Sequence, residues 1–517
     1  MNYVGTARPI HDAKGKATGY SKYAGDISLS NMAYLCMLHS KIPHGYVKAV
    51  HAEKALALPG VYGVYHCLNT SERKYNRYRS SFDQAYLANE ERAFNQYVRF
   101  VGDKIGAVAA CDQETAEKAA RLVEVEYEEL SFSIGFDDTL AGKNCLDGET
   151  PVRDEYELDV GEKQGSAEGL IEVCSTMELP RLHHATMETH ACIADYDPYS
   201  DMLTVYCPNQ AVHGIRTVLA DFLEMPESHV RVVKATMGGS FGAKQEWFLE
   251  PVTALVAKKL CRPVKLVYSR GEAMTDTIVR GAMRMSARGY YTPDGEMKEI
   301  YCDVTLDAGA YIGNAGDYVR ALAGKPTRCY RIPYMHYHGQ VISSNSPVSG
   351  AFRSWSAAEE ALMMERQLDA AAEKLGMDRL AIRLKNVARS GEEDKKLHLS
   401  LEDIRIGDAI TLGSEKFGWD KLKAEDAAFN ASQQRYRRGV GIGIGGHGNT
   451  YFPRFNDYGE GSISLNADGS MQANFTLHDH GCGTVTAMRM IAAEVLKVPE
   501  DKIYMTEGDT AVTPIDY

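Results

Sequence analysis

A glycine-rich stretch, Met237-Gly-Gly-Ser-Phe-Gly-Ala-Lys-Gln245, is the part of this sequence best suited to bind a ligand through its backbone. It follows a strand-like run over 229–236 and precedes a helical run that ends near Leu260. Its three glycines lack Cβ atoms, so the backbone can approach a ligand closely and adopt positive φ. A strand, a glycine-rich turn and a helix commonly present amide N–H groups to an anionic cofactor. The alternative is a tight turn that needs glycine for its shape alone.

Other motifs carry weaker chemical signals. Residues 439–446 contain a GxG pattern, but no helix follows it, so we expect a glycine-rich strand close to another backbone and not a dinucleotide site. His478 and His480 alternate on one strand, as do His336 and His338, and paired imidazoles can bind metal. Because no third ligand is evident, solvated or hydrogen-bonded histidines are the favoured interpretation.

The composition is that of a soluble globular protein, with 44% hydrophobic and 25% charged residues among 517. This length suggests about three domains. A net charge of -13 argues against a nucleic-acid or anionic-membrane surface, and no apolar run reaches the roughly 18 residues of a membrane span. Eleven scattered cysteines without a CxxC pair indicate a reducing compartment, hence the cytoplasm, and argue against an iron–sulfur cluster or structural zinc in this chain.

The glycine-rich stretch must be positioned by the elements around it. Strands and helices alternate from Ile171 to Asn386. Apolar residues at helical spacing predict a helix over 212–223, and a capping-box pattern at Ser356 and Glu359 predicts a long helix that ends at Leu375. Further predicted elements are a helix capped by Asp112, a strand over 123–127, a charged linker over 389–401, a strand over 472–477 and a helix over 484–496.

Several stretches together resemble, in the same order, the molybdenum-binding subunit of the xanthine dehydrogenase/aldehyde oxidase family, the molybdenum hydroxylases. They cover nearly all of the chain. The stretches are 12–19, 59–64 and 101–103 for the family's hammerhead-like first domain, 237–244, 262–270, 307–311 and 350–353 for its first cofactor domain, and 481–483 and 508–510 for its second.

The resemblance implies a fold of class α+β in three parts. An N-terminal α/β hammerhead-like domain would span residues 1–135, a first molybdopterin-binding domain 136–395, and the N-terminal part of a second, incomplete molybdopterin-binding domain 396–517. The implied cofactor is a molybdopterin carrying molybdenum. The implied partners are an iron–sulfur subunit with [2Fe-2S] centres and a flavin subunit with FAD, with no nucleic acid and no membrane span.

The resemblance also implies residue roles. Gln210 would be catalytic, since it stands at the spacing at which the family places a glutamine beside the metal's oxo ligand. Gln210, Phe241 and Arg353 would lie near the molybdenum without ligating it. Substrate would contact Gln245, Arg320 and Trp355. The cofactor-binding set would be Gln210, Gly239, Phe241, Gly242, Arg353, Gly481, Cys482 and Gly483. A neutral amide can hydrogen-bond an oxo ligand without adding charge, and arginine suits an anionic cofactor.

The sequence departs from the family pattern at several points. Ser240 and Ala243 replace loop glycines, Cys482 replaces a cofactor-contacting glutamine, and Gln245 stands where purine-oxidising members often have glutamate. The family's Gly-x-Gly-Glu stretch, which carries the base glutamate, is absent, so either a separate chain supplies it or the sequence is that of a truncated product.

The implied function is oxidative hydroxylation of a purine-like N-heterocycle or an aldehyde, with water as the oxygen source. The alternative is a truncated, non-catalytic fragment or assembly protein that keeps the fold without bound molybdenum.

Overall fold

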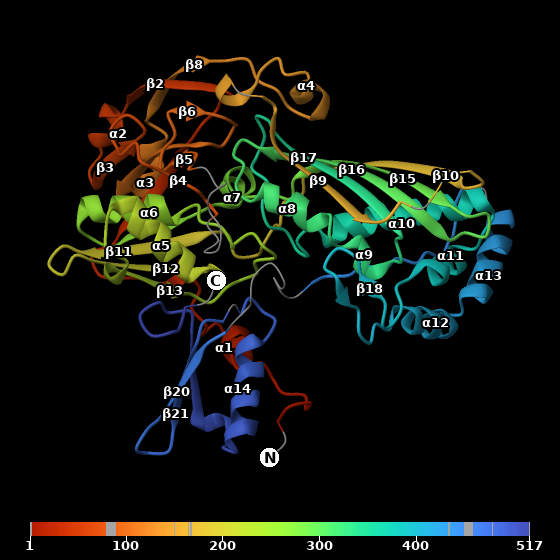
Figure 1. The fold of residues 1–517 in the computed structure, drawn as a ribbon. Helices are drawn as coiled ribbons and strands as arrows, with labels where there is room; N and C mark the ends of the chain where they lie inside the picture. Colours follow the sequence, from red (N-terminus) through yellow and green to blue (C-terminus); the bar gives the residue numbers. More distant parts are fainter. Residues whose placement is uncertain are drawn as a thin grey trace.

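The computed structural model describes residues 3–78, 89–148, 150–163, 165, 168–432, 435–448, 459–477 and 479–515. One large sheet has seven strands and joins segments that are far apart in the sequence (Figure 1). The order across this sheet is β13 (Val230–Lys234), β12 (Met202–Cys207), β11 (Ala191–Asp197), β14 (Val264–Val267), β1 (Ala33–His39), β7 (Lys104–Ala110) and β3 (Val61–His66). Strands of the first 110 residues therefore continue the sheet that carries the glycine-rich stretch.

Helices cover this sheet and bury its apolar side chains. The predicted helix over 212–223 is confirmed as α5 (Val212–Leu223), which packs on β13, and α6 (Glu250–Leu260) packs on β11, β12 and β14. Helix α5 packs on the core because its apolar residues recur at helical spacing, and all of them are buried. Helix α3 (Gln113–Ala120) covers β1 and β7, and Asp112 accepts a hydrogen bond from the Thr115 N–H, as its predicted cap.

A smaller sheet completes the N-terminal part. It runs β6 (Tyr97–Val98), β2 (Gly45–His51) and β8 (Glu124–Glu129), where a strand was expected. A buried charge cluster connects the paired strands β4 (Lys74–Tyr75) and β5 (Glu91–Arg92) with β7 of the large sheet. The Glu91 carboxylate accepts hydrogen bonds from Lys104 Nζ at 2.7 Å, Arg77 Nε at 2.7 Å and Tyr75 Oη at 2.9 Å. Glu91 is 1% exposed, so its charge is balanced by the two cations and not by water.

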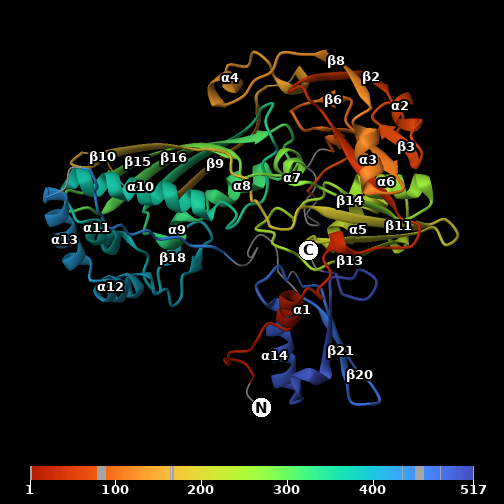
Figure 2. The ribbon, with the colours of Figure 1, turned by 180° about the vertical axis from the view of Figure 1, so that it is seen from behind.

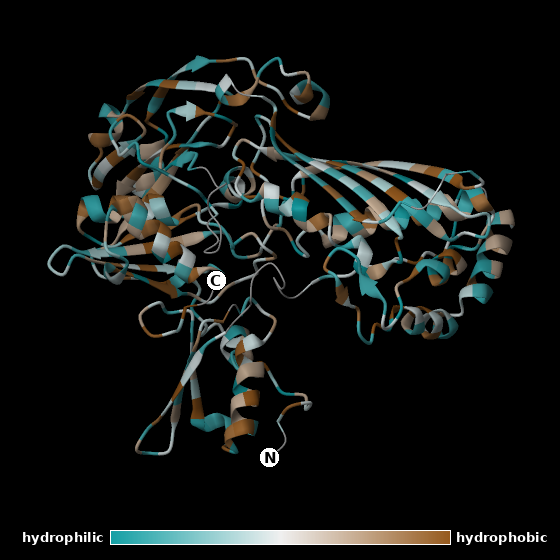
Figure 3. Cartoon of the chain, in the orientation of Figure 1, coloured by the Kyte–Doolittle hydropathy of each residue, from teal (hydrophilic) through white to brown (hydrophobic). Residues whose placement is uncertain are grey.

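A second core is built on a five-stranded sheet, seen edge-on at the right of Figure 1. Its order is β10 (Ile171–Leu179), β15 (Ala282–Tyr291), β16 (Met297–Gly309), β17 (Tyr334–Ser343) and β9 (Val152–Gly161). Buried and half-buried residues alternate along β15, because only one of its faces packs against α10 (Ala357–Leu375). The same alternation appears as polar and apolar bands across the long strands in Figure 3.

The third part contains β20 (Gly461–Leu465), β21 (Met471–Phe475) and β22 (Ile503–Glu507), with α14 (Thr484–Leu496) packed beside β22. Helix α14 has the predicted bounds. The start of the chain packs here: Tyr3 is buried in this core, the Tyr3 N–H donates to Glu494 at 2.7 Å, and the His11 N–H donates to Thr486. Helix α1 (Ala13–Thr18) accordingly lies beside α14 when viewed from either side (Figures 1 and 2).

Two segments differ from the expectations. The predicted linker over 389–401 forms a short hairpin of β18 (Glu393–Asp394) and β19 (Leu399–Ser400), held by buried Asp394, which accepts a hydrogen bond from Thr327. The glycine-rich run over 439–446 is wrong as a strand, since it joins no described ladder. It lies against the second core through Ile442 and Ile444 instead.

Candidate functional site

The glycine-rich loop leaves β13 and turns sharply before α6. The sequence predicted that a helix N-terminus would adjoin this loop, but α6 begins only at Glu250, beyond a turn over 241–247. The backbone N–H groups of the loop itself are therefore the available donors, in place of those of a helix N-terminus. The backbone N–H groups of residues 239–242 have no acceptor within the part of the chain that the structure describes. Adjacent backbone donors without acceptors are the kind of group that binds anions in proteins, even without a helix dipole.

A second loop, residues 349–356, faces the first at close range. The Arg353 N–H donates to the Phe241 carbonyl at 2.8 Å. A Cβ atom on Gly242 would lie 2.6 Å from the Ala351 carbonyl oxygen, and the φ of Gly242 is +99°. Glycine is therefore required where the two backbones meet.

Two buried histidines fasten these loops to the core. His190 Nε2 lies 2.9 Å from the Ala243 carbonyl, and His184 Nε2 lies 2.8 Å from the Ala351 carbonyl. Burial lowers the pKa of His190 to about 3 and that of His184 to about 4, so both rings are neutral and donate one N–H each to a carbonyl. The sequence predicted no role for either residue.

Gln210 contacts the first loop through both its backbone and its side chain. Its N–H donates to the Lys244 carbonyl at 2.8 Å, and its Oε1 accepts a hydrogen bond from Ser240 Oγ at 2.5 Å. Its Nε2 has no acceptor among the described residues. Gln210 therefore adds a neutral side-chain donor to the backbone donors of the loop.

Arg353 points a positive charge outward from the second loop. Its side chain is exposed, and its guanidinium has no carboxylate or carbonyl partner in the described ranges. Behind it, Arg280 donates to the Arg353 carbonyl at 3.2 Å and pairs with Glu359 at 2.5 Å. This buried pair fixes the backbone that carries the free cation.

Three consecutive residues after Arg353, Ser354, Trp355 and Ser356, have φ values of +81°, +42° and +64°. A left-handed run of non-glycine residues is strained and persists only where neighbours hold it. Here Lys325 Nζ donates to the Trp355 carbonyl and to Ser356 Oγ. The predicted capping box is consequently wrong: Ser356 precedes α10, but its side chain makes no cap hydrogen bond.

Trp355 is half-buried against both large cores, with the Tyr318 ring centroid 5.3 Å away. Gln245 is half-buried, its N–H donates to the Gly242 carbonyl, and its side chain has no described partner. Arg320 lies on α8 (Ala315–Leu322) and forms a bidentate ion pair with Asp154 at 2.5 and 2.8 Å. The structure thus engages the Arg320 charge in an ion pair with β9.

The third loop, around Gly481, Cys482 and Gly483, lies beside β13. Lys234 Nζ donates to the Asp479 carbonyl at 2.9 Å and pairs with Glu507 at 2.8 Å. Burial opposes ionisation of Asp479, but hydrogen bonds from the N–H groups of Gly481, Val485 and Gly483 lower its pKa. The exposed Cys482 lies 2.9 Å from Thr484 Oγ1.

The 508–510 motif attaches this third part to the large sheet. Arg231 forms a two-pronged ion pair with Asp509, at 3.0 and 2.6 Å. The Lys234 N–H donates to the Gly508 carbonyl at 2.8 Å, and the Thr510 N–H donates to the Val232 carbonyl. Both glycine-rich loops therefore flank β13, which neither motif alone could indicate.

Family comparisons match each part of this arrangement. The family model described as "Aldehyde oxidase and xanthine dehydrogenase, a/b hammerhead domain" matches residues 18–131, and two described as "Molybdopterin cofactor-binding domain" match residues 152–387 and 412–517. The chain is 32% identical over 524 residues to a probable xanthine dehydrogenase subunit from Bacillus subtilis, covering 99% of this chain and 67% of that protein. The chain belongs to the xanthine dehydrogenase/aldehyde oxidase family of molybdenum hydroxylases.

Other relatives extend the comparison. The chain is 29% identical over 530 residues to the xanthine dehydrogenase molybdenum-binding subunit of Escherichia coli O157:H7, covering 98% of this chain and 68% of that protein. It therefore spans about two thirds of the length of these relatives. The crystal structure of quinoline 2-oxidoreductase from Pseudomonas putida has the same fold, with a TM-score of 0.88, 23% identity, and 98% and 67% of the two chains covered.

The molybdenum hydroxylase family carries a molybdopterin with molybdenum, and the residues present fit that group. Four unpaired backbone N–H groups, the Gln210 amide and the free Arg353 guanidinium form a donor set suited to an anionic phosphate and dithiolene. No cluster of three or more His, Cys, Asp or Glu able to hold a metal ion occurs in the described ranges. His336 lies 3.1 Å from Asp159 and His338 3.3 Å from Glu155, whereas His478 lies outside the described residues.

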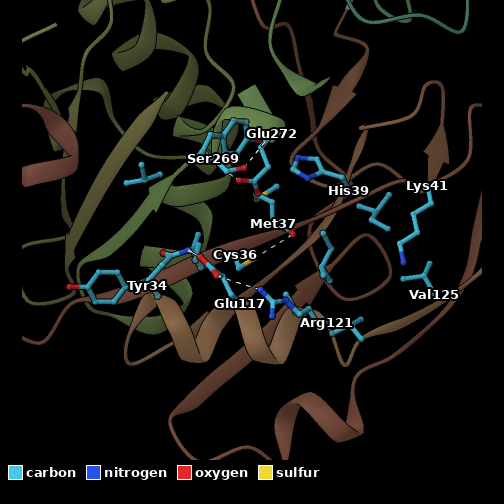
Figure 4. A pocket seen from close by; sticks show the side chains of 18 of the residues that line it. Tyr34, Cys36, Met37, His39, Lys41, Glu117, Arg121, Val125, Ser269 and Glu272 are labelled. Atoms are coloured by element: carbon cyan, nitrogen blue, oxygen red, sulfur yellow. Dashed lines mark hydrogen bonds and ion pairs between the residues drawn. The ribbon is translucent and has the colours of Figure 1, made fainter. Parts of the chain in front are cut away.

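A large pocket of this molybdenum hydroxylase chain lies away from these loops. It measures about 1080 Å³ and lies between β1, α3, β8 and the segment after β14 (Figure 4). Two of its carboxylates have partners: Glu117 Oε2 lies 3.8 Å from an Arg121 guanidinium nitrogen, and Glu272 accepts a hydrogen bond from the Ser269 N–H. No residue predicted for the site lines it, so donor geometry and not pocket volume locates the candidate site.

A buried carboxyl group beside the second loop makes the free energy of unfolding depend on pH. Glu246 is 1% exposed, and burial raises its pKa to about 8. Its ordinary pKa is 4.5. Between about pH 4.5 and 8, the folded protein therefore keeps this carboxyl group protonated, while the unfolded chain has released the proton. Its stability contribution is complete below about pH 4.5 and is lost as pH rises towards 8.

We therefore expect E246Q to flatten the fall in stability between about pH 5 and 8. Burial also raises the pKa of Glu250 to about 7 and that of Glu360 to about 8, so both contribute a slope of the same sign that the variant retains. The measurement is the urea unfolding midpoint across this range for the native protein and E246Q. Parallel curves for the two proteins would rule out a protonated Glu246.

Proposed function

We propose that this chain is the molybdopterin-binding subunit of an enzyme that hydroxylates a purine-like N-heterocycle or an aldehyde. The observation that carries this proposal is the donor set of residues 239–242, Gln210 and Arg353, for which no acceptor occurs in the described ranges. When bound, the cofactor supplies the two-electron oxidation, with water as the source of oxygen. The chain supplies binding and orientation.

Each residue contributes to that orientation. The loop amides and Arg353 would hold the anionic groups of the cofactor, and the Gln210 Nε2 would donate to an oxygen beside the metal. Trp355 would offer a flat apolar face to an aromatic substrate, with Gln245 beside the loop as a hydrogen-bond partner. Arg320 would contact substrate only by leaving Asp154, so we assign it the weakest role of the three.

We further propose that electrons pass to an iron–sulfur subunit and a flavin subunit. Relatives named as carbon monoxide dehydrogenase large chain and nicotinate dehydrogenase large molybdopterin subunit support an assembly of several chains. We place this assembly in the cytoplasm, which suits eleven free cysteines. No helix in the described residues is both long and apolar enough to cross a membrane.

Purification from native cells tests this function. We expect about one molybdenum and one pterin per chain, together with co-purifying chains that carry iron–sulfur and flavin centres, measured by metal analysis, cofactor release and mass spectrometry. Screening of N-heterocycles and aldehydes for hydroxylation then identifies the substrate class. A chain that emerges without molybdenum or partners would instead be a non-catalytic member that keeps the fold.

A further inference from the structure

The side-chain amide of Gln210 is held in one of its two possible orientations. The Ser240 hydroxyl is fully buried and accepts a hydrogen bond from the Lys244 N–H at 3.2 Å. Its only described acceptor is Gln210 Oε1, at 2.5 Å. A buried hydroxyl proton without an acceptor is costly, so the hydroxyl requires an oxygen, and not an NH2 group, on this side of the amide.

The opposite end of the amide is thereby fixed as a donor. The Gln210 backbone cannot turn, because its N–H is bound to the Lys244 carbonyl at 2.8 Å. With Oε1 held by Ser240, Nε2 is directed away from that hydroxyl and has no acceptor among the described residues. Without Ser240, the amide could rotate by half a turn about its last bond and present a carbonyl oxygen in place of a donor.

The loop that carries Ser240 is itself held at both ends by one carboxylate. Glu188 Oε2 accepts a hydrogen bond from the Gly238 N–H at 2.7 Å and from Lys244 Nζ at 2.6 Å. Lys244 is 1% exposed, so this pair lies inside the protein and not on its surface. The position of Ser240 relative to Gln210 is therefore determined by buried contacts before any ligand binds.

We propose that Ser240 is a positioning residue that orients the Gln210 amide with its NH2 group towards the molybdenum cofactor. This inference rests on the proposed function. Ser240 stands where the family resemblance predicts glycine. A glycine has no side chain to orient the Gln210 amide, whereas the Ser240 hydroxyl fixes that orientation. Ser240 acts through Gln210 and contacts no reacting atom itself.

The test compares S240A, Q210A and the double variant S240A/Q210A in the holoenzyme. We expect S240A to lower kcat about tenfold, the factor for one lost orienting hydrogen bond, while KM changes little. The molybdenum(V) EPR signal of the reduced protein should shift in S240A, since an altered donor changes the field at the metal. In the Q210A background, S240A should have no further effect on either measurement.

A second variant distinguishes loss of the positioning role from simple misfolding. S240T keeps the hydroxyl, so it should retain the native EPR signal and rate if its extra methyl group is accommodated, and the thermal unfolding of all variants is compared. Native kcat and EPR signal in S240A, or equal losses from S240A with and without Gln210, would overturn the positioning role while leaving the proposed function intact. Absence of molybdenum from the native protein would overturn both.

Discussion

G242A should lose about nine tenths of its molybdopterin. Gly242 has a φ of +99°, and an added Cβ would lie 2.6 Å from the Ala351 carbonyl oxygen and 3.1 Å from the Phe352 nitrogen. Both contacts are with backbone, which cannot move aside as a side chain does. Backbone strain of this kind costs about 1–3 kcal/mol, and about 1.4 kcal/mol is already a tenfold loss of affinity.

The measurement is molybdenum and pterin per chain, with thermal unfolding recorded on the same samples. G413A is a matched control, because Gly413 lies inside α12 (Ile406–Phe417) with no atom within 4 Å of an added Cβ. That change should leave cofactor content intact and stabilise the helix by up to about 1 kcal/mol. Native cofactor content in G242A would show that the two loops do not need their close contact.

E91A should cost about 3–5 kcal/mol of stability, a large share of what a domain has. It leaves Arg77, which is 2% exposed, without a described carboxylate partner within ion-pair distance. Lys104 keeps only Asp276, at 3.6 Å, among the described carboxylates. Burial opposes the ionised form of Glu91, yet Arg77 and Lys104 outweigh it and lower the pKa of this carboxyl group.

Urea unfolding at neutral pH measures this loss, with E91Q as an intermediate that keeps hydrogen-bonding atoms but removes the charge. The control is E124A, whose ion pair with Lys54 at 2.6 Å is solvent-exposed and should leave the unfolding midpoint unchanged. A destabilisation of E91A no larger than that of E124A would mean that water enters the cluster and replaces the carboxylate.

The sequence predicted individual elements well where the pattern was local. The helices over 212–223 and 484–496 and the cap at Asp112 follow from apolar spacing and one short polar side chain, and all three are confirmed. The capping box at Ser356 failed because a left-handed backbone and a distant lysine, Lys325, decide what that hydroxyl does. Such contacts have no signature in nearby sequence.

The site could be predicted in outline only through family resemblance. Spacing alone would not have placed Gln210 against the glycine-rich loop, 30 residues away from Ser240. The supports of that loop, Glu188 and His190, lie in the connection between β10 and β11, whose neighbours only the fold reveals. The roles of Gln245, Arg320 and Trp355 remain predictions, because no contact with a substrate tests them.

The packing of the first residues against the third part of the molecule also has a consequence for the order of events in the cell. Tyr3 contacts Glu494, 491 residues later. At typical rates of synthesis, roughly 25 to 100 seconds separate the appearance of these two segments from the ribosome. The amino-terminal segment therefore lacks this partner until the chain around Glu494 has been synthesised. Lys234 on β13 likewise meets the carbonyl of Asp479, 245 residues later, so both of these contacts can form only after most of this sequence has been synthesised.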